Sequence, residues 1–147
     1  MDGMASRDEF LLLALASASD GRLTPVQIQK AMFLLKQEAA QFVGPDFYEF
    51  VPYNYGPFNS SIYDDLNALA AAGLVTVDQS QGRSWAMYTI TGTGQQKAEQ
   101  VRQNVAPAIR DYTQNVVTWI KGQSFAGLLR SIYSKYPTFA VNSVFSH

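Results

Sequence analysis

Side chains that could carry acid–base, nucleophilic or metal chemistry are scarce in this chain. There is no cysteine, and the only histidine is the last residue, His147. The absence of cysteine removes disulfides, thiol nucleophiles and cysteine-based zinc sites, and a lone terminal histidine argues against a catalytic imidazole or a histidine metal cluster. We therefore predict that the chain is not an enzyme, and that it has no catalytic residue, metal or cofactor.

Two short motifs could still suggest chemistry. Asp64 and Asp65 could form a metal or acid–base pair, but neighbours on a helix point about 100° apart and do not converge. Near a helix start, they are more simply partners of the helix dipole. The "TGTG" run at 91–94 lacks the third glycine and the Lys-Ser/Thr of phosphate-binding loops. We expect it to begin a helix.

The composition limits the class of protein. The 147 residues suit one compact domain, and 47% of them are hydrophobic, which argues against disorder. Only 16% are charged, against about 25% in ordinary domains, so we expect part of the surface to be covered by a partner or a second copy. The net charge of −1 gives no overall attraction to nucleic acid or to an anionic membrane.

The apolar run near the start of the sequence bears on where the protein is located. The apolar run "FLLLALASA" at 10–18 could be mistaken for the core of a signal peptide. The segment before it carries one arginine against three acids, whereas signal peptides begin positively charged. No apolar run approaches the roughly 20 residues that a membrane span needs. We expect a cytoplasmic protein with no membrane association.

Capping residues indicate where the first two helices begin. Ser6 with Glu9 forms one capping box, and Thr24 with Gln27 forms a second. Pro25 suits the first helical position, where its missing N–H costs nothing. The first helix is apolar on most sides, so we expect it to be central and to end at Asp20-Gly21. The second carries an apolar stripe to about Val43, where Gly44-Pro45 stops it, with these members: Ile28, Ala31, Met32, Leu35, Ala39 and Phe42.

An aromatic segment then leads into a third helix. "FYEFVPY" at 47–53 predicts a short strand, and Tyr55-Gly56-Pro57 predicts a sharp turn. Asn59 suits the N-cap position, and Phe58 and Tyr63 could form a hydrophobic staple. We expect a helix over 60–72 that ends at Gly73 and buries the stripe Ile62, Leu66 and Leu69.

The rest of the chain reads as one hairpin followed by helices. We expect 74–78 to pair antiparallel with 84–90. Thr91 caps a helix over about 93–105, Pro107 begins or kinks the next, and Ser124 caps the last, which ends near Lys135. The apolar tail "TFAVNSVF" at 138–145 should dock on the body of the protein.

This order of elements is that of a winged-helix domain. Residues 60–94 resemble the PadR-type regulators, with the following matching positions: Tyr63, Leu66, Leu69, Gly73, Leu74, Val75, Tyr88, Ile90, Thr91 and Gly94. Within residues 24–75, "IQKAMFLL" at 28–35 and "PYNYGPF" at 52–58 are similar to the Panacea and SocA-like antitoxin group. The first resemblance implies DNA binding and dimerisation through the helices after the wing, and the second implies a protein partner.

We therefore predict a mainly α fold with a small β-hairpin: a winged helix-turn-helix with a C-terminal helical extension. Residues 1–94 would form the winged-helix domain, and 95–147 the extension, within the same compact unit. The chain departs from the DNA-binding pattern in two ways. Residues 44–58 replace the usual turn of about 3–4 residues. The outward positions of the 60–72 helix also lack lysine and arginine, since they are Asp64, Asp65, Asn67, Ala68 and Ala71.

Two functions stay open. The first is a transcriptional regulator that binds duplex DNA, and the predicted wing slightly favours it. This regulator would form a homodimer through helices in residues 95–136. Its contacts would be Asn59, Ser60, Ser61, Tyr63 and Arg83. Lys30 and Lys36 could flank the site, but they do not form a basic cluster. The alternative is a protein-interaction module, such as an antitoxin or accessory factor that does not bind DNA. Its partner-binding residues would be Tyr53, Tyr55, Tyr63 and Trp119.

The environment of the aromatic residues is a further open question. We expect Tyr53, Tyr55 and Phe58 to belong to the core with one ring exposed. A second group could form either a dimer or partner interface or the core of the helical extension: Trp119, Phe125, Leu128, Leu129 and Ile132.

Overall fold

Helices dominate the structure, and short antiparallel strands accompany them. The computed structural model describes residues 5–79 and 85–144. The helices are α1 (Arg7–Ser17), α2 (Pro25–Glu38), α3 (Ala40–Val43), α4 (Ser61–Ala71), α5 (Gly92–Asn104), α6 (Pro107–Lys121), α7 (Phe125–Lys135) and the 3₁₀ helix η1 (Pro137–Ala140). The strands are β1 (Arg22–Leu23), β2 (Val51–Tyr53), β3 (Gly56–Phe58), β4 (Val75–Asp78) and β5 (Met87–Ile90). The predicted fold class, mainly α with a small hairpin, is confirmed.

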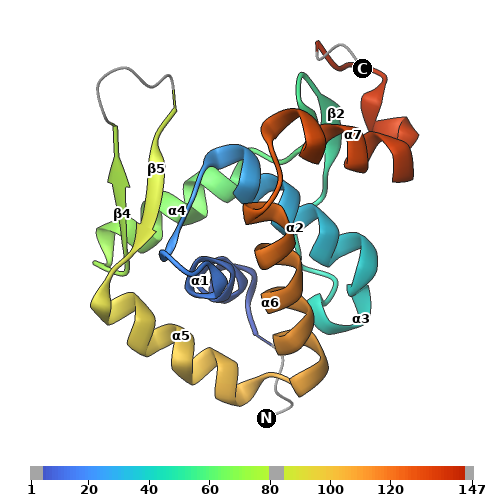
Figure 1. The fold of residues 1–147 in the computed structure, drawn as a ribbon. Coiled ribbons are helices and arrows are strands. Elements are labelled where there is room, and N and C mark those ends of the chain that lie inside the picture. The colour runs from blue at the N-terminus through green and yellow to red at the C-terminus, as the bar shows by residue number, and fades with distance from the viewer. Residues whose placement is uncertain (1–4, 80–84, 145–147) are drawn as a thin grey trace.

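Helix α1 forms the centre of the molecule, as its apolar sequence predicts. Every side chain from Phe10 to Leu15 is at most 1% exposed. Figure 1 shows α1 end-on with α2, α5 and α6 around it, and α4 also packs against it. The capping box of Ser6 and Glu9 is present, but the helix ends at Ser17, earlier than expected. Gly21, with φ of 71°, instead turns the chain into β1.

The three-stranded sheet has the order β1-β5-β4. Strands β4 and β5 pair antiparallel from Val75 opposite Ile90 to Asp78 opposite Met87. This pairing confirms the predicted hairpin, although residues 80–84 lie outside the described part of the chain. Strand β1 adds two further pairs to β5 and was not expected.

The aromatic segment forms a second hairpin of its own. Strand β2 pairs antiparallel with β3, so that Tyr53 lies opposite Gly56. The sequence predicted only a turn at Gly56-Pro57. Both strands are three residues long, and Pro52 faces Pro57 across the ladder. Gly56 has φ of 92°, which glycine adopts without strain.

The helices after the wing pack onto the helices before it. Helix α5 lies against α1, and α6 lies against both α1 and α2. Their predicted starts are confirmed, because the Thr91 and Ser124 hydroxyls accept backbone N–H groups and Pro107 opens α6. One hydrophobic cluster includes buried residues from α1 through α7. In the described residues, no helix is long and apolar enough to cross a membrane.

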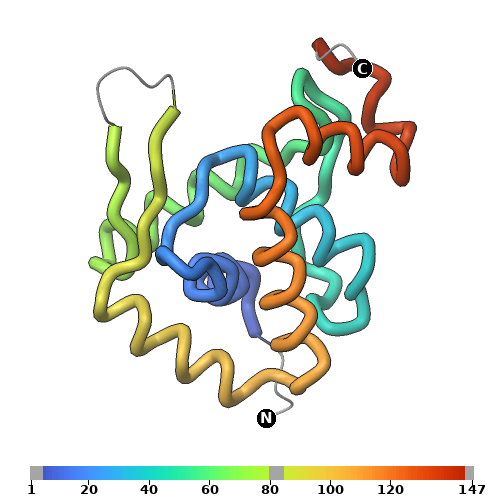
Figure 2. Tube along the Cα trace, in the orientation of Figure 1, coloured from blue at the N-terminus to red at the C-terminus, as the bar shows by residue number. Residues whose placement is uncertain are grey.

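The segment after α7 docks beside the second hairpin. The Phe139 ring packs at 67° on the ring of Phe33, with centroids 4.8 Å apart. The Val144 N–H donates to the Asn54 carbonyl over 2.9 Å, although the Val144 side chain is 66% exposed. The expected docking of the tail therefore applies to its backbone and to Phe139. Figure 2 shows the β2–β3 hairpin and the β4–β5 pair projecting from the same side of the helical body.

Candidate interaction site

The outer face of α4, where a winged helix would meet DNA, has little charge. Asp64, Asn67, Ala68 and Ala71 are exposed, and the described helix carries no lysine or arginine. Asp65 is not on this face, contrary to our prediction, because it points back toward the start of α1. There, Tyr48 donates to its Oδ2 over 2.6 Å, and Arg7 Nε lies 3.0 Å away.

Most cations in the described residues have an acidic partner within 3.5 Å. These pairs are Arg7 with Asp65, Arg22 with Asp20, Lys36 with Glu49, Lys97 with Glu9, Arg102 with Glu99, Lys121 with Asp20 and Lys135 with Glu38. Arg110 and Arg130 belong to α6 and α7 rather than to α4. Lys36, expected to flank a DNA site, is therefore paired.

Lys30, the other lysine expected to flank the site, is inside the protein. Its side chain is 2% exposed, and Nζ donates to the Pro57 carbonyl over 3.2 Å. Burial lowers the pKa of Lys30 to about 7, because a buried ammonium loses its hydration. Lys30 therefore does not flank a DNA site: its ammonium holds the backbone of strand β3 from inside the protein and cannot reach a phosphate.

The predicted contacts at the start of α4 are largely occupied by the protein itself. The Asn59 backbone exchanges two hydrogen bonds of 2.9 Å with the buried side chain of Gln29. Its Oδ1 accepts the Ser61 N–H over 2.8 Å, and its Nδ2 donates to the Glu49 carbonyl. Asn59 thus caps the chain just before α4, although Ser60 is the N-cap residue.

As far as the structure describes them, the remaining nucleic-acid candidates lie at the start of α4. Ser60 is exposed, Ser61 is half-buried, and Tyr63 is half-buried with its pKa raised by burial. Arg83 lies outside the described residues. The structure therefore brings Asn59, Ser60, Ser61 and Tyr63 together at one helix start.

The β2–β3 hairpin is held from several sides. Gln29 and Lys30 support it from α2, as described above. Tyr133 of α7 packs against Gly56 and donates to the Ser143 hydroxyl over 2.6 Å, and Ser143 in turn donates to the Asn54 carbonyl over 3.2 Å. These contacts fix the backbone of a turn whose tyrosine side chains face outward.

Both tyrosines of the turn are exposed, Tyr53 by 50% and Tyr55 by 45%. We had expected a single exposed ring. Tyr53 lies 4.8 Å from the ring of Phe58, which lies 6.0 Å from Tyr63, so these three rings form a row that leads to α4. Tyr55 points the other way and meets Phe125 of α7, with ring centroids 5.5 Å apart at 72°.

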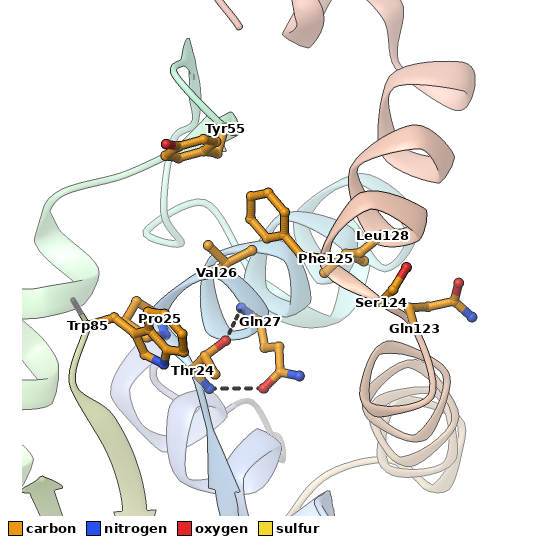
Figure 3. A pocket seen from close by; sticks show the side chains of 10 residues that line it. All are labelled: Thr24, Pro25, Val26, Gln27, Tyr55, Trp85, Gln123, Ser124, Phe125 and Leu128. Carbon is orange, nitrogen blue, oxygen red and sulfur yellow. Dashed lines mark hydrogen bonds between the residues drawn. The ribbon is translucent and has the colours of Figure 1, made fainter. Parts of the chain in front are cut away.

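Tyr55 belongs to an open groove of about 530 Å³. Its walls come from the start of α2, the turn of the second hairpin, a residue two positions before β5 and the junction of α6 with α7. Figure 3 shows Pro25 and Val26 between Trp85 and Phe125. The lining residues are Thr24, Pro25, Val26, Gln27, Tyr55, Trp85, Gln123, Ser124, Phe125 and Leu128. We name this surface the aromatic groove, and no member of this set is charged.

Three rings give the aromatic groove its character. Tyr55, Trp85 and Phe125 are 45%, 44% and 46% exposed. They come from separate parts of the chain, and the capping box of Thr24 and Gln27 fixes the floor while the Ser124 cap fixes the start of α7. Large rings left half in water on a fixed frame are typical of sites that bind another molecule.

The other predicted partner residues divide between surface and core. Trp119 is 39% exposed on α6 and does not line the aromatic groove. Leu128, Leu129 and Ile132 are at most 2% exposed, so they are core residues of the helical extension. Phe125, which we had considered as either interface or core, is exposed.

Sequence reasoning missed Trp85 as a site residue, because we assigned it to the second strand of the wing. The signal available was its position beside the polar run "QSQGRS" at 79–84, since a strand residue at a polar loop end is often exposed. Gln123 and the floor at Pro25 had no comparable signal. Their role depends on how α2 and α7 pack in three dimensions.

Comparison of the chain with protein-family models and with curated proteins finds no match. The likeness to PadR-type regulators and to SocA-like antitoxins therefore stays a prediction from the quoted residues.

Proposed function

We propose that the chain is a non-catalytic protein-interaction module built on a winged-helix frame, with the aromatic groove as its binding site. The observation that carries this proposal is the set of three rings, Tyr55, Trp85 and Phe125, each nearly half exposed around an uncharged groove. Tyrosine and tryptophan dominate the energetic centres of protein interfaces. This is the alternative left open by the sequence, and the geometry favours it over DNA binding.

The rigidity of the site supports the proposal. Binding costs free energy when loops must be ordered, and a site that is already ordered avoids much of that cost. The hydrogen bonds from Gln29 and Lys30, and the contact between Gly56 and Tyr133, hold the hairpin before any partner arrives. Tyr55 is thus presented on a fixed turn.

The charge of α4 also favours a protein partner. Contacts to phosphate come mostly from lysine, arginine and backbone amides. The exposed face of α4 offers an aspartate, an asparagine and two alanines. Asn59 already takes the Ser61 amide at the start of this helix. The described residues thus offer α4 little with which to hold a phosphate.

The test compares surface variants of the whole chain. Tyr55→Ser with Phe125→Ser removes two groove rings, and Trp119→Ser removes a similarly exposed ring elsewhere. A protein captured by the wild-type chain is identified, purified and titrated against each variant by calorimetry. We expect binding to weaken at least about tenfold in the groove variant, as for hot-spot residues, and to be unchanged in Trp119→Ser. Equal affinity for the wild-type chain and the groove variant would overturn the proposal.

DNA binding is the second candidate, and the strand order β1-β5-β4 with α4 before it is the observation that favours it. Fluorescence anisotropy with a labelled random duplex at low salt tests it. The logarithm of affinity should fall by about 0.9 per neutralised phosphate for each tenfold rise in salt. Binding that is lost in Arg83→Ala and kept in Tyr55→Ser with Phe125→Ser would favour this candidate over the protein-binding proposal.

A further inference from the structure

We propose that the occupant of the aromatic groove is an uncharged, proline-rich segment of a partner protein, bound in the extended polyproline II conformation. This inference rests on the proposed function and names the chemistry of the partner. Three properties of the described lining carry it: its lack of charge, the kind of polar group it offers, and its exposed rings.

The first property is the absence of charge. All ten lining residues are uncharged. A lysine or glutamate placed there would lose hydration without gaining an opposite charge, which is unfavourable. The groove therefore complements a neutral segment and discriminates against a charged one.

The second property is that several polar groups of the groove still have a hydrogen-bond donor to offer. Gln27 Oε1 already accepts the Thr24 N–H over 2.9 Å, so its side chain offers its amide N–H₂ (Figure 3). Ser124 Oγ accepts the Gly127 N–H over 3.0 Å, so its hydroxyl hydrogen can still donate. The indole of Trp85 can only donate. The capping interactions that start α2 and α7 thus engage the oxygens of Gln27 and Ser124 and leave their hydrogens available.

These donors suit a backbone that brings carbonyls without N–H groups. Proline has a carbonyl and no N–H, and the carbonyls of polyproline II make no internal hydrogen bonds. A helical ligand would satisfy most of its own carbonyls and leave these donors unused. A β-strand would bring N–H groups as well as carbonyls, and each of its N–H groups would need an acceptor of its own.

The third property is the set of rings. Proline-rich segments dock between exposed aromatic side chains, and their conformation is already formed before binding, so little entropy is lost. Trp85 stands on one side of Pro25 and Val26, and Phe125 with Tyr55 on the other (Figure 3). Proline rings can pack between these walls while the carbonyls turn toward the donors.

The test uses the chain's own fluorescence. The sequence has two tryptophans, so Trp119→Phe leaves Trp85 in the groove as the only one. This variant is titrated with three end-blocked peptides of equal length: one of proline and alanine, one amphipathic helix of leucine, alanine and glutamine, and one of glycine and serine. We expect a saturable change in Trp85 emission with the proline peptide alone.

Further substitutions locate the binding. Tyr55→Ser and Phe125→Ser, each in the Trp119→Phe background, should weaken the proline peptide at least about tenfold. Tyr53→Ser is the matched control, because Tyr53 is equally exposed on the same hairpin but does not line the groove. It should bind as the parent does.

The outcomes separate this inference from the proposed function. If the helical peptide binds in the groove, or if the purified partner binds there while the proline peptide does not, the inference is wrong and the interaction module stands. If neither the partner nor any peptide depends on Tyr55 and Phe125, both fail.

Discussion

Gln29 and Asn59, thirty positions apart, exchange a pair of hydrogen bonds. The side-chain amide of Gln29 pairs with the backbone N–H and carbonyl of Asn59, as a neighbouring strand would. Gln29 Nε2 donates to the Asn59 carbonyl, and the Asn59 N–H donates to Gln29 Oε1, both over 2.9 Å. Gln29 is 2% exposed, so the pair is shielded from water. It ties helix α2 to the turn that leads into α4.

Removing this pair should destabilise the fold. We expect Gln29→Ala to cost about 1–3 kcal/mol, because the Asn59 N–H and carbonyl would lose their partners in a partly buried place. Gln37→Ala is the control, since Gln37 is exposed on the same helix. Urea denaturation of both variants measures the difference. Equal midpoints would mean that water replaces Gln29 at no cost.

Lys30 should make stability depend on pH. Its pKa is lowered by burial to about 7 in the folded chain, from an ordinary value of 10.5. Between these values the unfolded chain holds a proton that the folded chain has lost, so the free energy of unfolding rises with pH. The rise approaches about 1.4 kcal/mol per pH unit. Below pH 7 this pH dependence disappears, because Lys30 is protonated in both the folded and the unfolded chain.

The pH experiment needs a window without tyrosine ionisation. Burial raises the pKa of Tyr112 to about 12 and also raises those of Tyr48 and Tyr136. A raised tyrosine pKa also makes stability depend on pH, because the folded chain keeps a proton that the unfolded chain loses. This effect begins only near the ordinary tyrosine pKa of about 10. Denaturation from pH 7 to about 9.5 therefore isolates Lys30. Lys30→Met should flatten the profile, and Lys36→Met, which removes an ion-paired lysine of the same helix, should not.

Gly56 should tolerate alanine less well than Gly73. Both have positive φ, 92° and 80°, so alanine at either position is strained by about 1–2 kcal/mol. A Cβ on Gly56 would also lie 3.1 Å from Cε1 of Tyr133, whereas nothing lies within 4 Å at Gly73. Thermal unfolding should therefore place Gly56→Ala below Gly73→Ala. The same melting temperature for both would show that Tyr133 moves freely.

Leu66 should be a strong determinant of stability. It is fully buried in α4, and Leu66→Ala should cost about 2–5 kcal/mol. Asn67→Ala, at the neighbouring exposed position, should have almost no effect. Chemical denaturation compares the two. A small loss at Leu66 would mean that the surrounding side chains collapse into the cavity.

The oligomeric state is a separate prediction. We expect a homodimer through helices in residues 95–136, on the grounds of the charge-poor sequence and the resemblance to PadR-type regulators. Light scattering should give twice 16.3 kDa. A wild-type monomer at high concentration would contradict this prediction.

Local signals explain how much of the fold could be predicted. The capping boxes at Ser6 and Thr24, the caps at Thr91 and Ser124 and the stop at Gly73 each depend on a few neighbouring residues, and all are present. Strand β1 could not be predicted, because two residues show no periodicity and form a strand only by pairing with β5. Strand β3 was hidden by Pro57, a residue that disfavours strands.

The candidate site was less predictable because it depends on packing. Tyr53 and Tyr55 were identified from their sequence, but the burial of Gln29 and Lys30 was not. The apolar stripe predicts one buried face of α2, whereas the β2–β3 hairpin covers a second face that includes these two polar side chains. The aromatic groove draws on four segments that are distant in sequence, so no single stretch reveals it.

The central position of α1 has a consequence for folding. Its buried side chains from Phe10 to Leu15 contact helices from both halves of the chain. Unfolding of either half would therefore expose apolar side chains of α1 to water. A fragment that stops at Thr91 would bare the flank that α5 and α6 cover. Unfolding should thus be a single cooperative event, with the slowest amide exchange in α1, and the wing-bearing half cannot be excised as an independent reagent.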